Sequence, residues 1–197
     1  FEPVGLECQM LRKNAGIIDI SNFAKYKVKG TAAASWLNSI FANNMPSIVG
    51  RSCLTPLIGV RGGIAGDFTV TLLSDNEFMI IGSGMAERYH QRFWNMVPMP
   101  QGVTFESLTE TMCGFNVAGP KSRELLKRLT NESLSTKEFP FMRSKKIEFA
   151  GVECVALRVS FTGDLGWELH CDVSDQQRLY KALLETGKAF GAGPVGN

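Results

Sequence analysis

The chain has 197 residues, of which 44% are hydrophobic and 20% are charged, and its formal net charge is +2. This composition is typical of a globular protein with a buried core, so it excludes intrinsic disorder as the main state. The net charge is too small to indicate a nucleic-acid partner, and no run reaches the roughly 18–20 apolar residues of a membrane span.

The first half of the chain combines short helices with short strands. The predicted elements are, in order, a helix over residues 6–15, an extended segment over 16–19, a strand over 25–29, a helix over 32–41, and strands over 54–60, 68–73 and 78–81. Short turns join the last three strands, which predicts an antiparallel meander.

Side-chain periodicity predicts which faces of these elements are buried. Lysines at alternate positions of 25–29 predict a strand with one solvated face. The predicted apolar helix faces are those of Ala33, Trp36, Leu37 and Ile40 and, in a further helix over 85–96, of Tyr89, Phe93 and Met96.

The second half of the chain contains more strand than helix. The predicted elements are strands over 103–108 and 112–118, a helix over 121–129 that follows Pro120, strands over 145–149, 152–161 and 167–171, and a helix over 175–190. Ser174 and Gln177 predict a capping box at the start of the last helix. Helices mixed with strands that short turns connect predict an α+β fold, with antiparallel sheets and flanking helices.

The cysteines predict a reducing environment. There are five, which is an odd number, and no pair has CxxC spacing: Cys8, Cys53, Cys113, Cys154 and Cys171. We therefore expect reduced, buried thiols rather than a disulfide framework, and a cytoplasmic location, or the mitochondrial matrix in a eukaryote. Only two histidines are present, and no metal site is predicted.

Two short motifs that could carry chemistry are weak. Gly82-Ser83-Gly84 lies where a dinucleotide-binding loop would lie, but the third glycine of that motif would fall at Glu87, whose carboxylate would repel a pyrophosphate. A simple strand-to-helix turn is favoured. His170 and Cys171 are neighbours on a predicted strand and point to opposite faces, which argues against a nucleophilic Cys–His pair.

Asp67 is a candidate catalytic residue. It is the only acidic residue between Asp19 and Asp75, and it begins an apolar strand beside Gly66. A desolvated carboxylate at this place could hold or move a proton on a cationic substrate. The alternative is a turn aspartate that caps a hairpin.

Glu168 is a candidate binding residue on a predicted hairpin. On the returning strand it shares a face with Gly166 and His170. A carboxylate there, flanked by Phe161 and Trp167, could accept two N–H bonds from an aminopyrimidine edge. The alternative is an exposed strand glutamate.

Four segments together resemble one known family. They are GGIAGDFTV, FNVAGPKSRELL at residues 115–126, LTNESLSTKEFPF at 129–141 and RVSFTGDLGWELH at 158–170. In their order and spacing they resemble the glycine cleavage T-protein (aminomethyltransferase) family, and most of all the tetrahydrofolate-binding region of dimethylglycine and sarcosine dehydrogenases. The resemblance covers nearly the whole chain, residues 1–197, and implies a T-protein-like folate-binding fold, with two interleaved subdomains.

The resemblance implies roles for four residues. Asp67 matches the catalytic carboxylate of the family near the reactive folate nitrogens. The backbone of Thr69 and the carboxylate of Glu168 match groups that hold the pterin ring, and Phe161 matches an aromatic residue of that pocket. The family often has a tyrosine at this last position, and phenylalanine retains its stacking but not its hydroxyl.

The implied reaction is one-carbon transfer. An iminium or formaldehyde unit from a methylated amine, such as dimethylglycine or sarcosine, would be captured as 5,10-methylenetetrahydrofolate. The alternatives are a glycine cleavage aminomethyltransferase, a non-catalytic folate-binding regulatory module and, less in keeping with Asp67 and Glu168 together, a structural domain.

The resemblance also implies a longer protein. The chain begins at Phe1 and ends at Asn197, and both ends look cut. A FAD domain would precede Phe1 and a smaller domain would follow Asn197, so FAD is expected only outside this chain. Neither a nucleic acid nor a membrane is expected as a partner.

Overall fold

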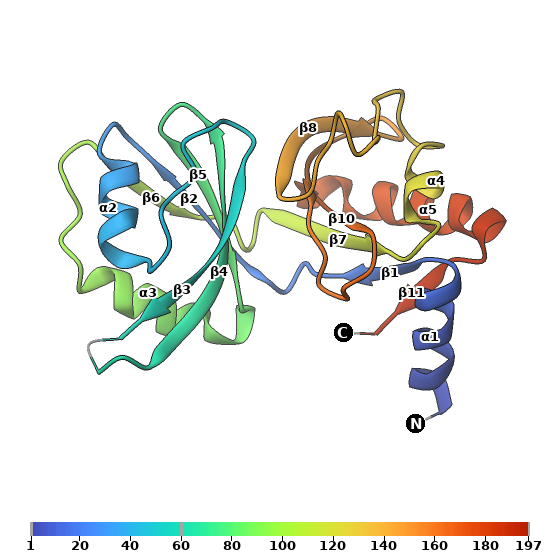
Figure 1. Cartoon of the computed structure of the whole chain (residues 1–197), viewed down its shortest axis with the longest axis horizontal. Helices are drawn as coiled ribbons and strands as arrows, with labels where there is room; N and C mark the ends of the chain where they lie inside the picture. The colour runs from blue at the N-terminus through green and yellow to red at the C-terminus, as the bar shows by residue number, and fades with distance from the viewer. Residues whose placement is uncertain (1, 60, 197) are drawn as a thin grey trace. The chain divides into compact units, whose positions relative to one another are not determined.

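Two sheets organise the chain, and each forms the centre of a compact unit (Figure 1). The computed structural model describes residues 2–59 and 61–196. The inserted unit is Asn22–Glu110, and the split unit combines the residues up to Ser21 with those from Thr111 onward. The chain therefore starts the split unit, builds the inserted unit, and returns to complete the first.

The inserted unit contains a five-stranded sheet in the order β3-β4-β5-β2-β6. Its elements are β2 (Ala24–Lys29), α2 (Ala33–Ile40), β3 (Ser52–Ile58), β4 (Ile64–Ser74), β5 (Glu77–Gly82), the 3-10 turn η1 (Gly84–Ala86), α3 (Glu87–Asn95) and β6 (Thr104–Ser107). All neighbouring strands in this sheet are antiparallel. The predicted meander is confirmed as β3, β4 and β5.

The predicted apolar face of α2 is confirmed, because its four residues are the buried residues of that helix. They join a hydrophobic core with alternate residues of the sheet, among them Phe68 and Val70 of β4. The face of β4 that contains Phe68 and Val70 is therefore buried in the core. The intervening residues, Asp67 and Thr69, point to the opposite face of the strand.

The split unit contains a six-stranded sheet in the order β11-β1-β7-β10-β9-β8. Its elements are α1 (Glu2–Lys13), β1 (Gly16–Asp19), β7 (Met112–Ala118), α4 (Ser122–Leu126), β8 (Arg143–Phe149), β9 (Val152–Arg158), β10 (Gly166–Asp172), η2 (Val173–Asp175), α5 (Gln176–Gly187), η3 (Lys188–Phe190) and β11 (Gly193–Val195). Only the pair of β1 with β11 is parallel among these described strands.

Helices α4 and α5 pack against one face of the split-unit sheet (Figure 1). Leu125, Leu179 and Leu183 from these helices share a hydrophobic core with Phe115 of β7 and Trp167 of β10. Since strand side chains alternate, Asn116, Glu168 and His170 lie on the sheet face that points away from this core.

Several predicted boundaries are wrong at the ends of elements. Helix α4 is shorter than the predicted 121–129, and β11 was not expected at all. The strand predicted over 54–60 is β3, and its last position, Val60, lies outside the described residues. The predicted capping box is replaced by Asp172, whose carboxylate accepts from the backbone N–H and the hydroxyl of Ser174.

Two predicted burial patterns are also wrong. Helix α3 buries His90 and Trp94, whereas Tyr89 and Met96 are exposed. The His90 side of the helix is the one that packs on Phe68. On β2 the predicted solvated face is confirmed at Lys29, which is exposed, and is wrong at Lys25. Lys25 is fully buried, and its Nζ donates to the Phe23 carbonyl at 2.8 Å. None of the described helices is long and apolar enough to cross a membrane.

Candidate functional site

Asp67 and Thr69 lie on β4 of the inserted unit. Asp67 stands opposite Pro56 of β3, and Thr69 stands between Leu54 of β3 and Ile81 of β5. Asp67 is exposed, in contrast to the desolvated carboxylate that the apolar strand suggested, and Thr69 is half-buried. The Asp67 carboxylate is thus accessible to solvent and to a ligand.

A buried histidine lies behind Asp67, on the other side of the strand. A Cβ atom added to Gly66 would lie 3.0 Å from the His90 Nε2, so the imidazole rests directly against this glycine. The His90 Nε2 has no hydrogen-bond partner among the described residues. Burial lowers the pKa of His90, and the charges of Glu87 and Asp67 oppose that shift. The helical periodicity did not predict that His90 is buried, because we expected the polar residues of this helix on its solvent side.

Glu168 lies near the middle of β10 in the split unit and is 7% exposed. The exposed-glutamate alternative is therefore wrong. The Nε2 of His170 lies 3.1 Å from the Glu168 Oε2. Since a carboxylate only accepts, this nitrogen carries the proton and donates. His170, which is completely buried, thus holds the Glu168 carboxylate in one orientation.

Asn116 of β7 stands directly opposite Glu168 in the register, and Ile18 of β1 stands on its other side. Asn116 is 1% exposed, and neither its Nδ2 nor its Oδ1 has a hydrogen-bond partner among the described residues. Sequence reasoning missed this residue. The signal that could have found it is a single amide in an otherwise apolar strand, at a position that faces away from the core.

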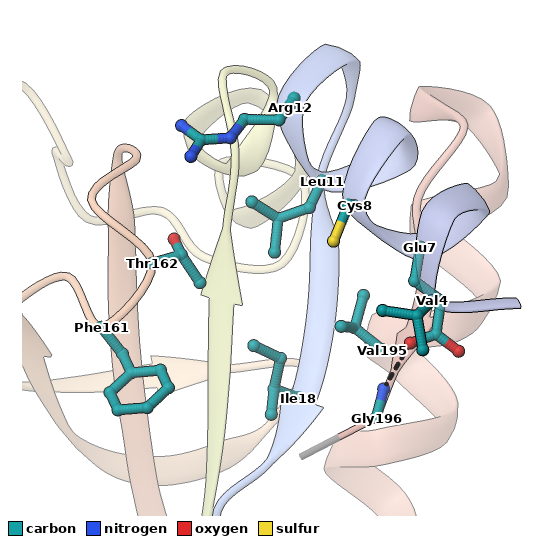
Figure 2. A pocket seen from close by; sticks show the side chains of 10 residues that line it. All are labelled: Val4, Glu7, Cys8, Leu11, Arg12, Ile18, Phe161, Thr162, Val195 and Gly196. Carbon is teal, nitrogen blue, oxygen red and sulfur yellow. Dashed lines mark hydrogen bonds between the residues drawn. The ribbon is translucent and has the colours of Figure 1, made fainter. Parts of the chain in front are cut away.

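A pocket of about 510 Å³ lies in the split unit (Figure 2). Phe161 and Thr162 lie on one side of it and side chains of α1 on the other, with Ile18 between them. Ile18 is the register partner of Asn116 and lines this pocket, whereas neither Asn116 nor Glu168 lines it. Near the C-terminal end of β11, the Gly196 N–H donates to the Glu7 Oε2 at 2.9 Å and closes the far side.

The predicted site residues therefore fall into two groups. Phe161 and Glu168 belong to the split unit, with His170 and Asn116 beside Glu168. Asp67 and Thr69 belong to the inserted unit, two positions apart on one strand.

The buried thiols form a separate cluster in the split-unit core. The Sγ atoms of Cys113 and Cys171 lie 3.3 Å apart, across the β7–β10 pair. The hydrogen bond with Cys171, together with burial, raises the pKa of Cys113 far above its usual range, so this thiol stays protonated. Cys8 is exposed and Cys53 half-buried, so the expectation of buried thiols is wrong for these two.

Comparison with known families decides the classification. The family model for the GCVT N-terminal domain matches residues 1–197, the whole chain. The chain belongs to the GCVT N-terminal domain family. The predicted resemblance is thereby confirmed.

Two curated relatives show how the domain is used. The mitochondrial dimethylglycine dehydrogenase of Mus musculus is 33% identical over 100% of this chain, which covers 23% of that protein. An aminomethyltransferase of Thermoanaerobacter sp. (strain X514) is 27% identical over 100% of this chain, which covers 53% of that protein. The GCVT domain described here thus spans about half of one relative and less than a quarter of the other, and both relatives are enzymes.

The fold is that of a solved aminomethyltransferase. The crystal structure of glycine cleavage system aminomethyltransferase T from Bartonella henselae superposes with a TM-score of 0.83, at 21% identity, over 98% of this chain and 50% of that one. The predicted α+β fold of the T-protein type is confirmed.

Proposed function

We propose that this GCVT domain binds tetrahydrofolate and transfers a one-carbon unit to it, within a larger protein that demethylates an amine such as dimethylglycine or sarcosine. The observation that carries the proposal is the buried Glu168 carboxylate, which His170 orients at 3.1 Å. Phe161, in the same unit, lines a pocket. Membership of the family and the match to a dimethylglycine dehydrogenase support the proposal.

The residues of the split unit fit a pterin ring. A carboxylate that is held in one orientation accepts two N–H bonds from a 2-aminopyrimidine edge in a bidentate manner. Such a pairing compensates the cost of keeping the Glu168 charge away from water. Phe161 is exposed at the pocket and offers an aromatic face for stacking, with no hydroxyl to add a hydrogen bond.

Asp67 is proposed as the residue that moves protons. Tetrahydrofolate, when bound, supplies the two nitrogens that receive the one-carbon unit. Each loses its proton as a bond to that carbon forms, and the departing amine takes up one of the two. The exposed Asp67 carboxylate is accessible to accept the other, and its charge stabilises a cationic iminium. The backbone of Thr69 is proposed as a further ring contact.

The larger protein is proposed to supply the oxidation. Conversion of a methylated amine to an iminium removes two electrons, and we place the FAD that accepts them in a domain outside this chain. The small-molecule partner is then the methylated amine or its iminium. A reducing compartment is proposed, the mitochondrial matrix in a eukaryote, in line with the mitochondrial name of the dehydrogenase relative.

Calorimetric titration of the full-length protein with tetrahydrofolate tests ring binding. Glu168→Gln removes one acceptor oxygen and the charge, and is expected to weaken binding by about tenfold or more. Glu153→Gln, on the exposed side of the neighbouring strand β9, is the matched control and should bind normally. Equal affinity for the wild type and Glu168→Gln would reject the role of Glu168.

A second function, folate binding without transfer, is favoured by one observation. Asp67 is exposed, whereas catalytic carboxylates are commonly desolvated. A protein that binds tetrahydrofolate tightly but does not raise the rate of methylenetetrahydrofolate formation from a methylated amine above the rate without protein would support this regulatory function.

A further inference from the structure

We infer that Asn116 is a ligand-contacting residue, whose side-chain amide binds the oxygen next to the N–H groups that pair with Glu168, in a 2-amino-4-oxopyrimidine ring. This inference rests on the proposed function and deepens it, because it names the part of the ring that the site would distinguish. It is carried by the placement of Asn116 and by its unpaired polar atoms.

The amide of Asn116 is buried without compensation. Both its Nδ2 and its Oδ1 lack a partner among the described residues, although the residue is almost fully buried. Each unpaired buried polar group costs about 1–3 kcal/mol. Residues that carry such a cost in a native structure call for an explanation, and a ligand that supplies the missing partner is one.

The register neighbours of Asn116 give its amide no hydrogen bond. Ile18 and Glu168 flank it in the register, and Ile18 offers no polar atom. The Oε2 of Glu168 is already engaged by His170, which lies over Gly114, where an added Cβ would come within 2.8 Å of the imidazole Nδ1. On the other side, the next row of the sheet contains only Gly16, Ala118 and Gly166.

The pair is complementary to one arrangement of ring atoms. Glu168 accepts hydrogen bonds and Asn116 can donate them, so the pair matches an edge with two donors followed by an acceptor. Directly opposite residues have Cβ atoms about 4.5–5.5 Å apart, which suits contacts to adjacent groups of one ring. Glu168 is 7% exposed and Asn116 1%, so both polar groups are held away from water.

Substitutions of similar size test this role. Asn116→Leu in the full-length protein keeps the shape but removes both polar atoms, and is expected to weaken tetrahydrofolate binding by about tenfold. Its thermal stability without ligand should equal or exceed that of the wild type, because a buried unpaired amide is lost. Asn131→Leu, at an exposed position, is the control and should bind normally.

A change of ligand preference separates contact from structural support. Asn116→Leu offers no donor to the ring oxygen, so its preference for tetrahydrofolate over the analogue without the 4-oxo group should be about tenfold lower than that of the wild type. If Asn116→Leu binds tetrahydrofolate as the wild type does and keeps the same preference, the role of Asn116 is overturned and the proposed function stands. If the wild type binds no reduced pterin, the proposed function itself fails.

Discussion

His170 is the residue whose contact most directly shapes the proposed site. It donates to Glu168 from the same face of β10, and both side chains are buried. His170→Phe should weaken tetrahydrofolate binding by about tenfold, because the carboxylate loses the donor that orients it. His170→Gln retains a donor and should restore most of the affinity.

Titration calorimetry of the two variants checks this prediction. The circular dichroism spectrum of His170→Phe should remain native, because a benzene ring fits where an imidazole lay. Equal losses in both variants would show that His170 acts through packing alone and does not orient Glu168.

His90 predicts how stability depends on pH. Phe68 packs against its ring, and the Tyr26 hydroxyl lies 3.5 Å from its Nδ1. Burial lowers its pKa below the ordinary value of 6.5, against the opposing charges of Glu87 and Asp67. The unfolded chain therefore binds more protons below that value than the folded chain does. The stabilising contribution is present above pH 6.5 and is lost as the pH falls through the folded-state pKa.

Urea unfolding at about pH 7 and about pH 5 measures this effect. His90→Phe, which keeps an aromatic ring in the same cluster, should lose less unfolding free energy on acidification than the wild type. An identical loss in the two proteins would assign the pH dependence to other groups.

Single-residue roles were only partly readable from the sequence. The alternation of β10 correctly placed Glu168 and His170 on one face, because a strand has a fixed period of two. The exposure of Asp67 and the burial of Asn116 were not readable, since both depend on which segments pack above the strand. A lone amide in an apolar strand gives no periodic signal.

At the scale of the element, α3 contributes the buried side chain of Trp94 to the aromatic core of the inserted unit. Trp94 is 5% exposed, and its ring centroid lies 4.5 Å from that of Tyr26. Trp94→Ala should lower the free energy of unfolding by about 3–5 kcal/mol, because it leaves a cavity in this cluster.

Met96 of the same helical segment supplies the control. It is 68% exposed, so Met96→Ala should change stability by less than about 0.5 kcal/mol. Urea denaturation of both variants measures the difference, and a comparable loss in each would contradict the burial of the His90–Trp94 side of α3.

The elements themselves were mostly predictable, whereas their ends were not. Short apolar runs between turn residues identified β3, β4 and β5, and the spacing of Trp36, Leu37 and Ile40 identified the buried face of α2. Strand β11 was missed because it has only three residues and pairs with β1, far away in the sequence. The buried side of α3 was misjudged because His90 and Trp94, whose rings each contain a nitrogen that can form a hydrogen bond, pack inward.

At the scale of the whole molecule, the fold class followed from the mixture of helices and short antiparallel connections. The division into an inserted and a split unit depends on the pairing of β1 with β7, which closes a gap of almost a hundred residues. No local pattern encodes such a pairing, so the sequence suggested the interleaving only through the family resemblance.

We propose that this domain transfers a one-carbon unit to tetrahydrofolate within a longer protein, as the greater length of its relatives suggests. The most direct test is the rate at which the full-length protein forms 5,10-methylenetetrahydrofolate from a methylated amine in a single turnover. Asp67→Asn should reduce this rate by about a hundredfold or more while tetrahydrofolate still binds, and Asp75→Asn, in an exposed turn, should match the wild type. Formation of methylenetetrahydrofolate at the wild-type rate in Asp67→Asn would contradict the account.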